Sequence, residues 1–196
     1  MEMKFPGEIL ERFSQAMQDA EAAGEPEPTA MSLATTDANG RVSVRTMLLK
    51  DLDSTGFVFY TNTRSKKAQQ LSQCPQAALC MVWKSVFCQL RVEGEVERVT
   101  ENEADEYFAT RSRGSQVGAW ASLQSEPLDC RETLEQLVAD VEQKFAGRDV
   151  PRPSHWSGYR LIPDMIEFWY GKKSHLHDRY RFTLKAGQWN RQRLFP

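Results

Sequence analysis

The chain has 196 residues, of which 40% are hydrophobic, and its formal net charge is −2 at pH 7. This length allows one well-formed core but barely two, and the near-neutral charge gives no reason to expect a nucleic-acid or membrane partner. No apolar run reaches the length of a membrane span and residues 1–6 lack the core of a signal peptide, so we expect a cytoplasmic protein.

An amphipathic helix is expected near the start of the chain, over residues 8–23. Apolar side chains recur there at three-and-four spacing, which is the helical period. They are Ile9, Leu10, Phe13, Met17 and Ala20. Gly24 ends this helix, and the sequence Glu-Pro-Glu-Pro at residues 25–28 forms a stiff connector.

From Thr29 onwards the pattern becomes that of strands. The Asn39-Gly40 pair is a strong hairpin signal, and it separates expected strands at residues 30–36 and 41–50. A third strand follows at residues 57–61. The three strands lie close together in sequence, as the strands of an antiparallel sheet do.

A short helix is expected over residues 66–72, with Ser65 in the capping position. Its first turn carries Lys66 and Lys67, although lysines at that end oppose the helix dipole. Two readings stay open. The lysines and the free backbone N–H groups hold an anion, or they form an ordinary solvated basic turn.

The rest of the chain mixes strands with inserted helices. Strands are expected over residues 77–83, 87–99, 156–162, 165–170, 179–184 and 189–194, and helices over residues 101–110, 112–122 and 128–146. Most strands follow one another by hairpins, which favours an antiparallel barrel over a parallel βαβ sheet. We therefore expect one mainly β, α+β domain over residues 1–196: a helix and connector at 1–28, then a barrel with inserted helices at 29–196.

Two groups of residues are candidates for binding an anion. The segment 45–50 is an apolar strand with a cation at each end, Arg45 and Lys50. Tyr107 and Arg111 lie four residues apart on a predicted helix face, and with Ser115 they make a phosphate clamp of arginine and hydroxyl donors. The alternative for Arg111 is simple compensation of the helix dipole.

The histidines near the C-terminus are the candidates for chemistry. His175 and His177 are two residues apart, so on a strand they would share a face, with Arg179 on the same face. This is half a metal site without an evident third ligand, and contact with an anionic or aromatic ligand is the alternative. Trp169 either stacks on a ring or fills the core. We expect no metal.

The four cysteines, Cys74, Cys80, Cys88 and Cys130, contain no CxxC pair. A metal site or a disulfide scaffold is therefore not indicated. We expect reduced and mostly buried thiols, as in a cytosolic protein.

Taken together and in order, these segments resemble the pyridoxine/pyridoxamine 5′-phosphate oxidase family from about Phe5 to the end. The matching motifs are residues 45–50, 59–62 and 65–68, Gln89, Tyr107-Phe108 with Arg111, residues 115–120, Gln124-Ser125, and residues 151–156, 166–169, 176–179 and 193–196. The resemblance implies an antiparallel split β-barrel homodimer with FMN at the subunit interface.

The resemblance also implies roles for individual residues. The cofactor-binding residues would be Arg45, Thr46, Met47, Leu48, Leu49, Lys50, Tyr60, Thr61, Lys66, Lys67, Gln89, Gln124, Ser125, Trp169 and Arg179. Lys50, Tyr107, Arg111 and Ser115 would grip the substrate phosphate, and His175 and His177 would lie over the pyridine ring as the catalytic residues. Of the FMN residues, Tyr60, Thr61, Lys66 and Lys67 would hold the phosphate end.

The implied reaction is oxidation of pyridoxine or pyridoxamine 5′-phosphate to pyridoxal 5′-phosphate, with O2 as acceptor and H2O2 as product. Two alternatives remain: a split-barrel flavoenzyme for another small anionic substrate, and a non-catalytic FMN- or pyridoxal-phosphate-binding paralogue. Three departures bear on the choice. His175 stands where the family has arginine, which is a different donor; Lys66 replaces another arginine; and the family's N-terminal segment over the substrate is expected to be missing.

Overall fold

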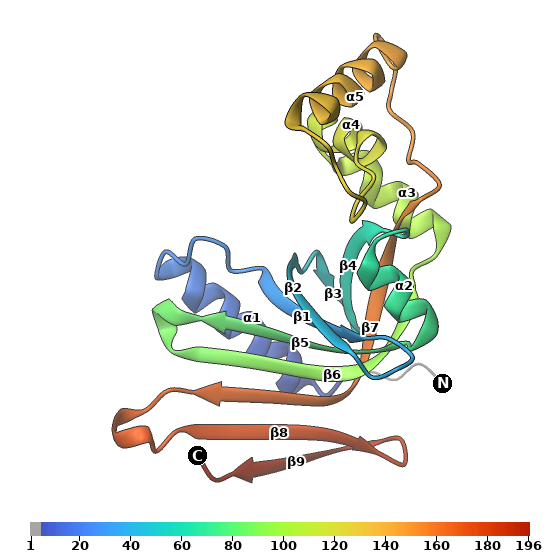
Figure 1. Cartoon of the computed structure of the whole chain (residues 1–196). Coiled ribbons are helices and arrows are strands. Elements are labelled where there is room, and N and C mark those ends of the chain that lie inside the picture. Colours follow the sequence, from blue (N-terminus) through green and yellow to red (C-terminus); the bar gives the residue numbers. More distant parts are fainter. Residues whose placement is uncertain (1–4) are drawn as a thin grey trace.

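The structure is a computed structural model that describes residues 5–196 (Figure 1). Its α-helices are α1 (Gly7–Ala22), α2 (Lys66–Gln73), α3 (Glu101–Thr110), α4 (Arg113–Ala121) and α5 (Arg131–Lys144), with short 3-10 helices η1 (Lys84–Val86) and η2 (Lys173–His175). Its strands are β1 (Ala30–Thr36), β2 (Val42–Leu48), β3 (Asp51–Leu52), β4 (Phe57–Asn62), β5 (Gln76–Trp83), β6 (Cys88–Arg98), β7 (Trp156–Tyr170), β8 (Asp178–Lys185) and β9 (Gln188–Leu194).

The described strands form one antiparallel sheet. Its order is β2-β1-β5-β6-β7-β4-β3. Strand β4 pairs with the first part of β7, β8 pairs with the last part of β7, and β9 pairs with β8. Figure 1 shows this sheet strongly curled, with α3, α4 and α5 stacked beyond one end and the β8–β9 hairpin along the opposite side. This is the antiparallel half-barrel expected from the hairpin order.

Strand β7 corrects one expectation. We predicted two strands divided near Pro163, but β7 is continuous and pairs with β6 along its length. The ladder shifts register between Glu93 and Gly94, opposite the proline, and a Cβ on Gly94 would come within 2.1 Å of the Ile162 carbonyl oxygen. Since proline donates no ladder hydrogen bond, the bulge lets the strand bend there without ending.

The core lies between the inner face of the sheet and α1. Ile9 and Ala20 of α1 are fully buried, as are Phe57 and Phe59 of β4. Along β6 the apolar residues are buried while the intervening polar ones are partly or fully exposed, because successive side chains of a strand point to opposite faces. Helix α1 therefore covers the inner face of the sheet. Helix α3 packs against the other face of β4 and β7.

Two smaller expectations also need correction, and one short strand was not expected. Residues 51–52 form the short strand β3, and α5 begins at Arg131, not at residue 128. All four cysteines are free, but only Cys88 is buried, so the expectation of mostly buried thiols is wrong. Within the described part of the chain, no helix is both long and apolar enough to cross a bilayer.

Candidate active site

Lys67, in the first turn of α2, is a buried lysine. It is 7% exposed, and its Nζ donates hydrogen bonds to Thr61 Oγ1 (3.0 Å), Ser65 Oγ (3.3 Å) and Gln124 Oε1 (3.1 Å). Among residues 5–196, no carboxylate lies within 4.0 Å of it. Burial, and then the charge of Arg45, lower the pKa of Lys67 to about 8.

Arg45, on β2, is a second partly buried cation at the same place. Its Nη1 donates to the Leu33 carbonyl oxygen (3.1 Å) and to Thr35 Oγ1 (2.7 Å), and its Nη2 donates to Gln70 Oε1 (3.3 Å). Burial lowers its pKa. Two neighbouring cations with only neutral partners are costly without an anion, so this place fits the phosphate of a bound nucleotide.

The N-terminus of α2 supplies backbone donors beside Lys67. Ser65 occupies the N-cap position, as expected, but its side chain does not cap the helix and instead accepts from Lys67. The Lys66 N–H donates to Ser125 Oγ at 3.3 Å, which brings together residues 59 positions apart in the chain. The alternative of a solvated basic turn is wrong for the buried Lys67, whereas Lys66 is exposed.

A cavity of about 330 Å³ lies next to these groups. It is lined by Met47, Tyr60, Thr61, Asn62, Arg111, Ser115, Gly118, Ala119, Ser122, Gln124 and Trp156. The expected anion clamp thus meets the expected cofactor residues in one hollow. Arg111 Nη1 is buried there without a hydrogen-bond partner, and a buried guanidinium nitrogen left in that state calls for an acceptor.

Aromatic rings form one wall of this cavity. Tyr60 stacks on Tyr107 with ring centroids 4.0 Å apart and on Trp156 at 5.2 Å, and the Arg111 guanidinium lies 4.8 Å from the Trp156 ring centroid. Burial, followed by the charge of Glu103, raises the pKa of Tyr60 to about 12, so this phenol stays protonated. Tyr107 therefore reaches the site through its stack on Tyr60. Tyr107 lies on α3, and Arg111 is the C-cap residue of the same helix.

Of segment 45–50, only Met47 lines this cavity. Arg45 and Met47 are partly buried on alternate positions of β2, and Thr46 between them is exposed. Leu48 is partly buried and Leu49 is 5% exposed. Lys50 is exposed, with its backbone N–H donating to the Val58 carbonyl oxygen at 2.9 Å.

The second group of predicted residues forms a row across three strands. Gln89 of β6 is directly opposite Trp169 of β7, which is directly opposite Arg179 of β8. Partners in adjacent strands point to the same face, so an amide, an indole and a guanidinium share one surface. Trp169 also helps to line a hollow of about 490 Å³ with Phe87, Gly171, Lys172, Lys173, Ser174, His175 and His177.

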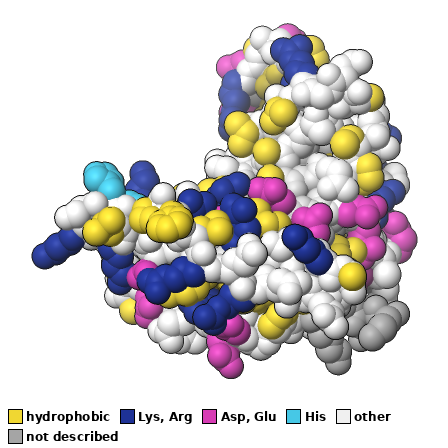
Figure 2. Space-filling model, turned by 90° about the horizontal axis from the view of Figure 1, so that it is seen from below, with side chains coloured by type: hydrophobic (Ala, Val, Ile, Leu, Met, Phe, Trp, Pro, Cys, Tyr) yellow, Lys and Arg dark blue, Asp and Glu magenta, His cyan; other side chains and the backbone are white. Residues whose placement is uncertain are grey.

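The two histidines lie outside the strands, because η2 ends at His175 and β8 begins after His177, so the shared strand face considered for them does not apply. Their rings are nevertheless close, with centroids 5.6 Å apart, and the His177 ring centroid is 4.4 Å from that of Trp169. The Lys172 N–H donates to His177 Nδ1 at 3.1 Å. Figure 2 shows histidine and basic side chains gathered at this end of the molecule.

Glu167 is a functional candidate that the sequence reading missed. It is 2% exposed; its Oε1 accepts from Arg179 Nε and Nη2 (2.9 and 2.7 Å) and its Oε2 from Arg181 Nε and Nη2 (3.0 and 2.8 Å). Burial would raise the pKa of Glu167, but the two arginines outweigh it and lower the pKa. A glutamate two residues before Trp169, hence on the same strand face, was the available signal.

The two groups lie at opposite ends of β7. Trp156 borders the first cavity and Trp169 the second, and thirteen residues of strand between them correspond to about 40 Å along the chain. One small ligand cannot touch both groups within one chain. Among residues 5–196, no three His, Cys, Asp or Glu side chains gather as a metal site would require.

Comparison with known proteins gives a consistent family. A family model described as pyridoxamine 5′-phosphate oxidase matches residues 17–145, and one described as the pyridoxine 5′-phosphate oxidase C-terminal dimerisation region matches residues 156–196. Pyridoxine/pyridoxamine 5′-phosphate oxidase from Myxococcus xanthus is 53% identical over 97% of this chain and 93% of its own length. The Brucella canis enzyme of the same name is 49% identical over 96% and 94%.

Solved structures agree on the fold. PhzG from Burkholderia lata 383, in complex with tetrahydrophenazine-1-carboxylic acid, superposes with a TM-score of 0.92 at 30% identity, over 97% of this chain and 94% of that one. A pyridoxamine 5′-phosphate oxidase-related, FMN-binding protein from Nostoc punctiforme superposes with a TM-score of 0.76 at 18% identity, over 95% and 96%. The second likeness supports the fold alone.

Proposed function

Because the chain belongs to the pyridoxamine 5′-phosphate oxidase family, it is an FMN-dependent oxidoreductase of pyridoxine and pyridoxamine 5′-phosphate, and we propose that O2 is its electron acceptor. Pyridoxine 5′-phosphate and O2 then give pyridoxal 5′-phosphate and H2O2. The amine substrate additionally consumes water and releases ammonia. The observation that carries the assignment is the pair of cations without a carboxylate, Lys67 and Arg45, beside the cavity that holds Arg111.

We propose that Lys67, Lys66, Thr61 and Tyr60 hold the phosphate end of FMN. The support is the buried ammonium of Lys67, whose partners are all neutral. The remaining residues that would hold FMN lie on β2 and its end, after α4, and in the row across β6, β7 and β8. They are Arg45, Thr46, Met47, Leu48, Leu49, Lys50, Gln124, Ser125, Gln89, Trp169 and Arg179. When bound, FMN supplies a two-electron acceptor for a hydride from the substrate.

The chain's own residues would bind and orient the substrate. Arg111, Ser115, Tyr107 and Lys50 would grip its phosphate, and the free Nη1 of Arg111 is the best-supported contact. His175 and His177 would lie against its ring. Holding the reacting carbon in one place is mainly a proximity effect.

We propose that each FMN site is completed by a partner subunit. The family model for the C-terminal region names it as a dimerisation region, and the chain is accordingly taken as a homodimer. The support for a shared site is the distance along β7 between the two groups of residues, about 40 Å. In a two-fold dimer, the row Gln89–Trp169–Arg179 of one subunit can face the Lys67 cavity of the other.

The experiment that tests the function is an anaerobic titration of the FMN-loaded protein with pyridoxine 5′-phosphate. Loss of the oxidised-flavin absorbance, and its return when air is admitted with formation of H2O2, would support substrate, cofactor and acceptor together. A flavin that is not reduced by this substrate would contradict the proposal.

A second substrate class is favoured by one observation. PhzG, 30% identical, was crystallised with tetrahydrophenazine-1-carboxylic acid, and this chain carries His175 in place of the family arginine. A flat aromatic carboxylic acid without a phosphate is therefore the alternative substrate, and the same titration with such an acid would identify it. We further propose a cytoplasmic location, which the four free cysteines support.

A further inference from the structure

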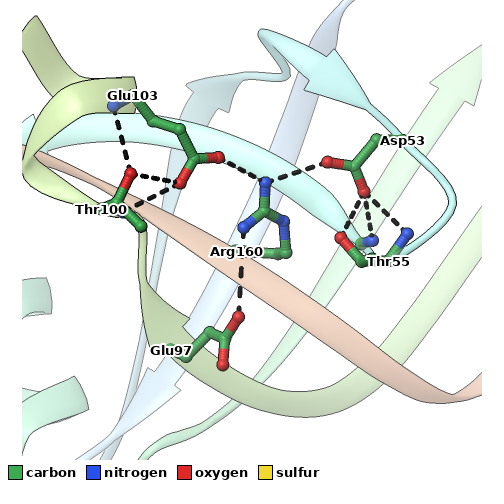
Figure 3. A network of polar contacts seen from close by, with 7 residues as sticks. Asp53, Thr55, Glu97, Thr100, Glu103 and Arg160 are labelled. Atoms are coloured by element: carbon green, nitrogen blue, oxygen red, sulfur yellow. Dashed lines mark hydrogen bonds and ion pairs between the residues drawn. The ribbon is translucent and has the colours of Figure 1, made fainter. Parts of the chain in front are cut away.

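Arg160, in the first half of β7, joins the turn after β3 to the start of α3 (Figure 3). Its side chain is 13% exposed, and its Nη2 donates to Asp53 Oδ2 at 2.9 Å and to Glu103 Oε1 at 2.7 Å. Glu97 is more distant, with its Oε1 4.0 Å from Nη1. One guanidinium nitrogen thus serves two carboxylates, one in the turn after β3 and one in α3.

Asp53 divides its two oxygens between local and distant partners. Oδ1 accepts from the backbone N–H groups of Thr55 (2.7 Å) and Gly56 (3.0 Å), which closes the turn, while Oδ2 is left for Arg160. Gly56 lies against the arginine stem, since a Cβ there would come within 2.6 Å of Arg160 Cγ. The turn is therefore fixed directly on Arg160.

Glu103 divides its oxygens in the same way. Oε2 accepts from the N–H and the hydroxyl of Thr100, both at 2.9 Å, and completes the capping box at the start of α3. Oε1 is left for Arg160. The hydrogen bond from Arg160 is the leading reason that the pKa of Glu103 is lowered. Arg160 therefore holds the helix at its N-terminal cap.

The two joined segments carry the proposed phosphate grip. Lys50 is three residues before Asp53, at the other end of β3. Tyr107 and Arg111 follow Glu103 by four and eight residues, on the same side of α3. The arginine network thus connects the segment that follows Lys50 with the helix that carries Tyr107 and leads to Arg111, which lines the cavity.

The helix is attached to β7 at two matched points. Glu103 meets Arg160, and Arg111 lies over Trp156 at 4.8 Å. Eight residues of helix rise about 12 Å and four residues of strand about 13 Å, so both attachments are satisfied together. A helix fixed in this way cannot slide along the strand without breaking one of them.

We propose that Arg160 is a positioning residue that sets the spacing between Lys50 and the Tyr107–Arg111 pair, and thereby the enzyme's selectivity for phosphorylated substrates. The proposal rests on the function proposed above. It differs from a purely structural role because it predicts a loss confined to the phosphate grip.

Two conservative variants each remove one of the two carboxylates that pair with Arg160. Glu103→Gln keeps the capping box, because glutamine also serves there, and Asp53→Asn keeps an oxygen for the turn. Glu97→Gln is the matched control, since it removes a carboxylate near the same guanidinium from a strand that carries no part of the grip. Each FMN-loaded variant is assayed with pyridoxine 5′-phosphate and with unphosphorylated pyridoxine.

We expect Glu103→Gln and Asp53→Asn each to raise the KM for pyridoxine 5′-phosphate by roughly tenfold, with kcat little changed, as for a loosened binding contact. At saturating FMN, the kcat/KM for pyridoxine stays at the wild-type value, and Glu97→Gln changes neither the kcat/KM for pyridoxine nor the KM for pyridoxine 5′-phosphate. The double variant is no worse than either single one, because either change already breaks the link.

The proposal is overturned if the preference for the phosphorylated substrate survives in both single variants, or if their losses multiply in the double variant. Equal losses on both substrates at saturating FMN would mean a general structural role and would also overturn it. Failure of the proposed function is seen separately, because the wild-type enzyme itself would then not oxidise pyridoxine 5′-phosphate in preference to pyridoxine.

Discussion

The ammonium nitrogen of Lys67 lies 3.0 Å from the hydroxyl oxygen of Thr61, and both side chains are buried. Neither group neutralises the other, so the folded protein holds a positive charge that only a ligand can balance. Burying an unpaired charge costs several kcal/mol. The cost is reasonable at a site built for an anion, and it makes Lys67 the most informative residue for the cofactor half of the site.

We expect Lys67→Met to weaken FMN binding by about 10- to 100-fold, because a hydrogen bond to a charged group contributes roughly 1.5–3 kcal/mol. The same change should leave the FMN-free protein as stable as the wild type or more so, since it removes an unpaired buried charge. Flavin fluorescence titration and thermal melting measure the two effects. Lys185→Met, at an exposed lysine of β8, is the control; equal FMN affinity in both variants would contradict the assignment.

The lowered pKa of Lys67 predicts a pH dependence. The folded value is about 8 against 10.5 for the ordinary lysine, so between these values the unfolded chain binds more protons and stability rises with pH. Over this window the cost of burying the Lys67 ammonium is relieved, so the FMN-free protein becomes more stable as pH rises, while FMN affinity falls as the ammonium is lost above pH 8. Chemical denaturation of wild type and Lys67→Met from pH 7 to 10 isolates this contribution; parallel curves would rule it out.

The sequence predicted the β1–β2 hairpin and strand β6 well because their signals are local. The Asn39-Gly40 hairpin and the alternation in β6 are set by residues next to one another. Pro163 misled the division of β7, since the strand continues past the proline through a bulge at Asp164, which is visible only in the pairing with the distant strand β6. Arg160 was missed for the same reason, because its partners Asp53 and Glu103 come from segments distant in the chain. For Glu167, the only local signal was its place two residues before Trp169.

Glu167→Gln should lower the free energy of unfolding by about 3–5 kcal/mol, because it leaves Arg179 and Arg181 without their shared buried carboxylate. Chemical denaturation at pH 7 measures the loss. In the wild type, the pKa of Glu167 is lowered on folding, so this stability is present above pH 4.5 and is lost as pH falls through the folded value.

An exposed ion pair supplies the control for that change. Glu135 on α5 pairs with Arg131 at 3.0 Å, with side chains 62% and 74% exposed, and Glu135→Gln should cost no more than about 1 kcal/mol. If the two variants unfold at the same denaturant concentration, the buried carboxylate does not hold the arginines as argued.

His175→Arg should raise the activity on pyridoxine 5′-phosphate. Arginine restores a permanent charge and a planar donor fork that histidine lacks, beside His177 and Trp169 in the same hollow. Steady-state kinetics at several pH values measures the change, and His175→Gln, which has neither charge nor fork, should not raise it. A rate that is unchanged or lower in the arginine variant would show that this replacement does not limit the enzyme.

Mixed dimers test the shared site most directly. Lys67→Met damages one group of residues and Trp169→Ala the other, and each homodimer then has two damaged sites. If each site takes Lys67 from one subunit and Trp169 from its partner, a mixed dimer concentrates both changes in one site and leaves the other intact. Two differently tagged chains, co-expressed and purified on both tags, should therefore bind one FMN per dimer with wild-type affinity. If both groups came from the same subunit, both sites of the mixed dimer would stay damaged and no tight FMN binding would return.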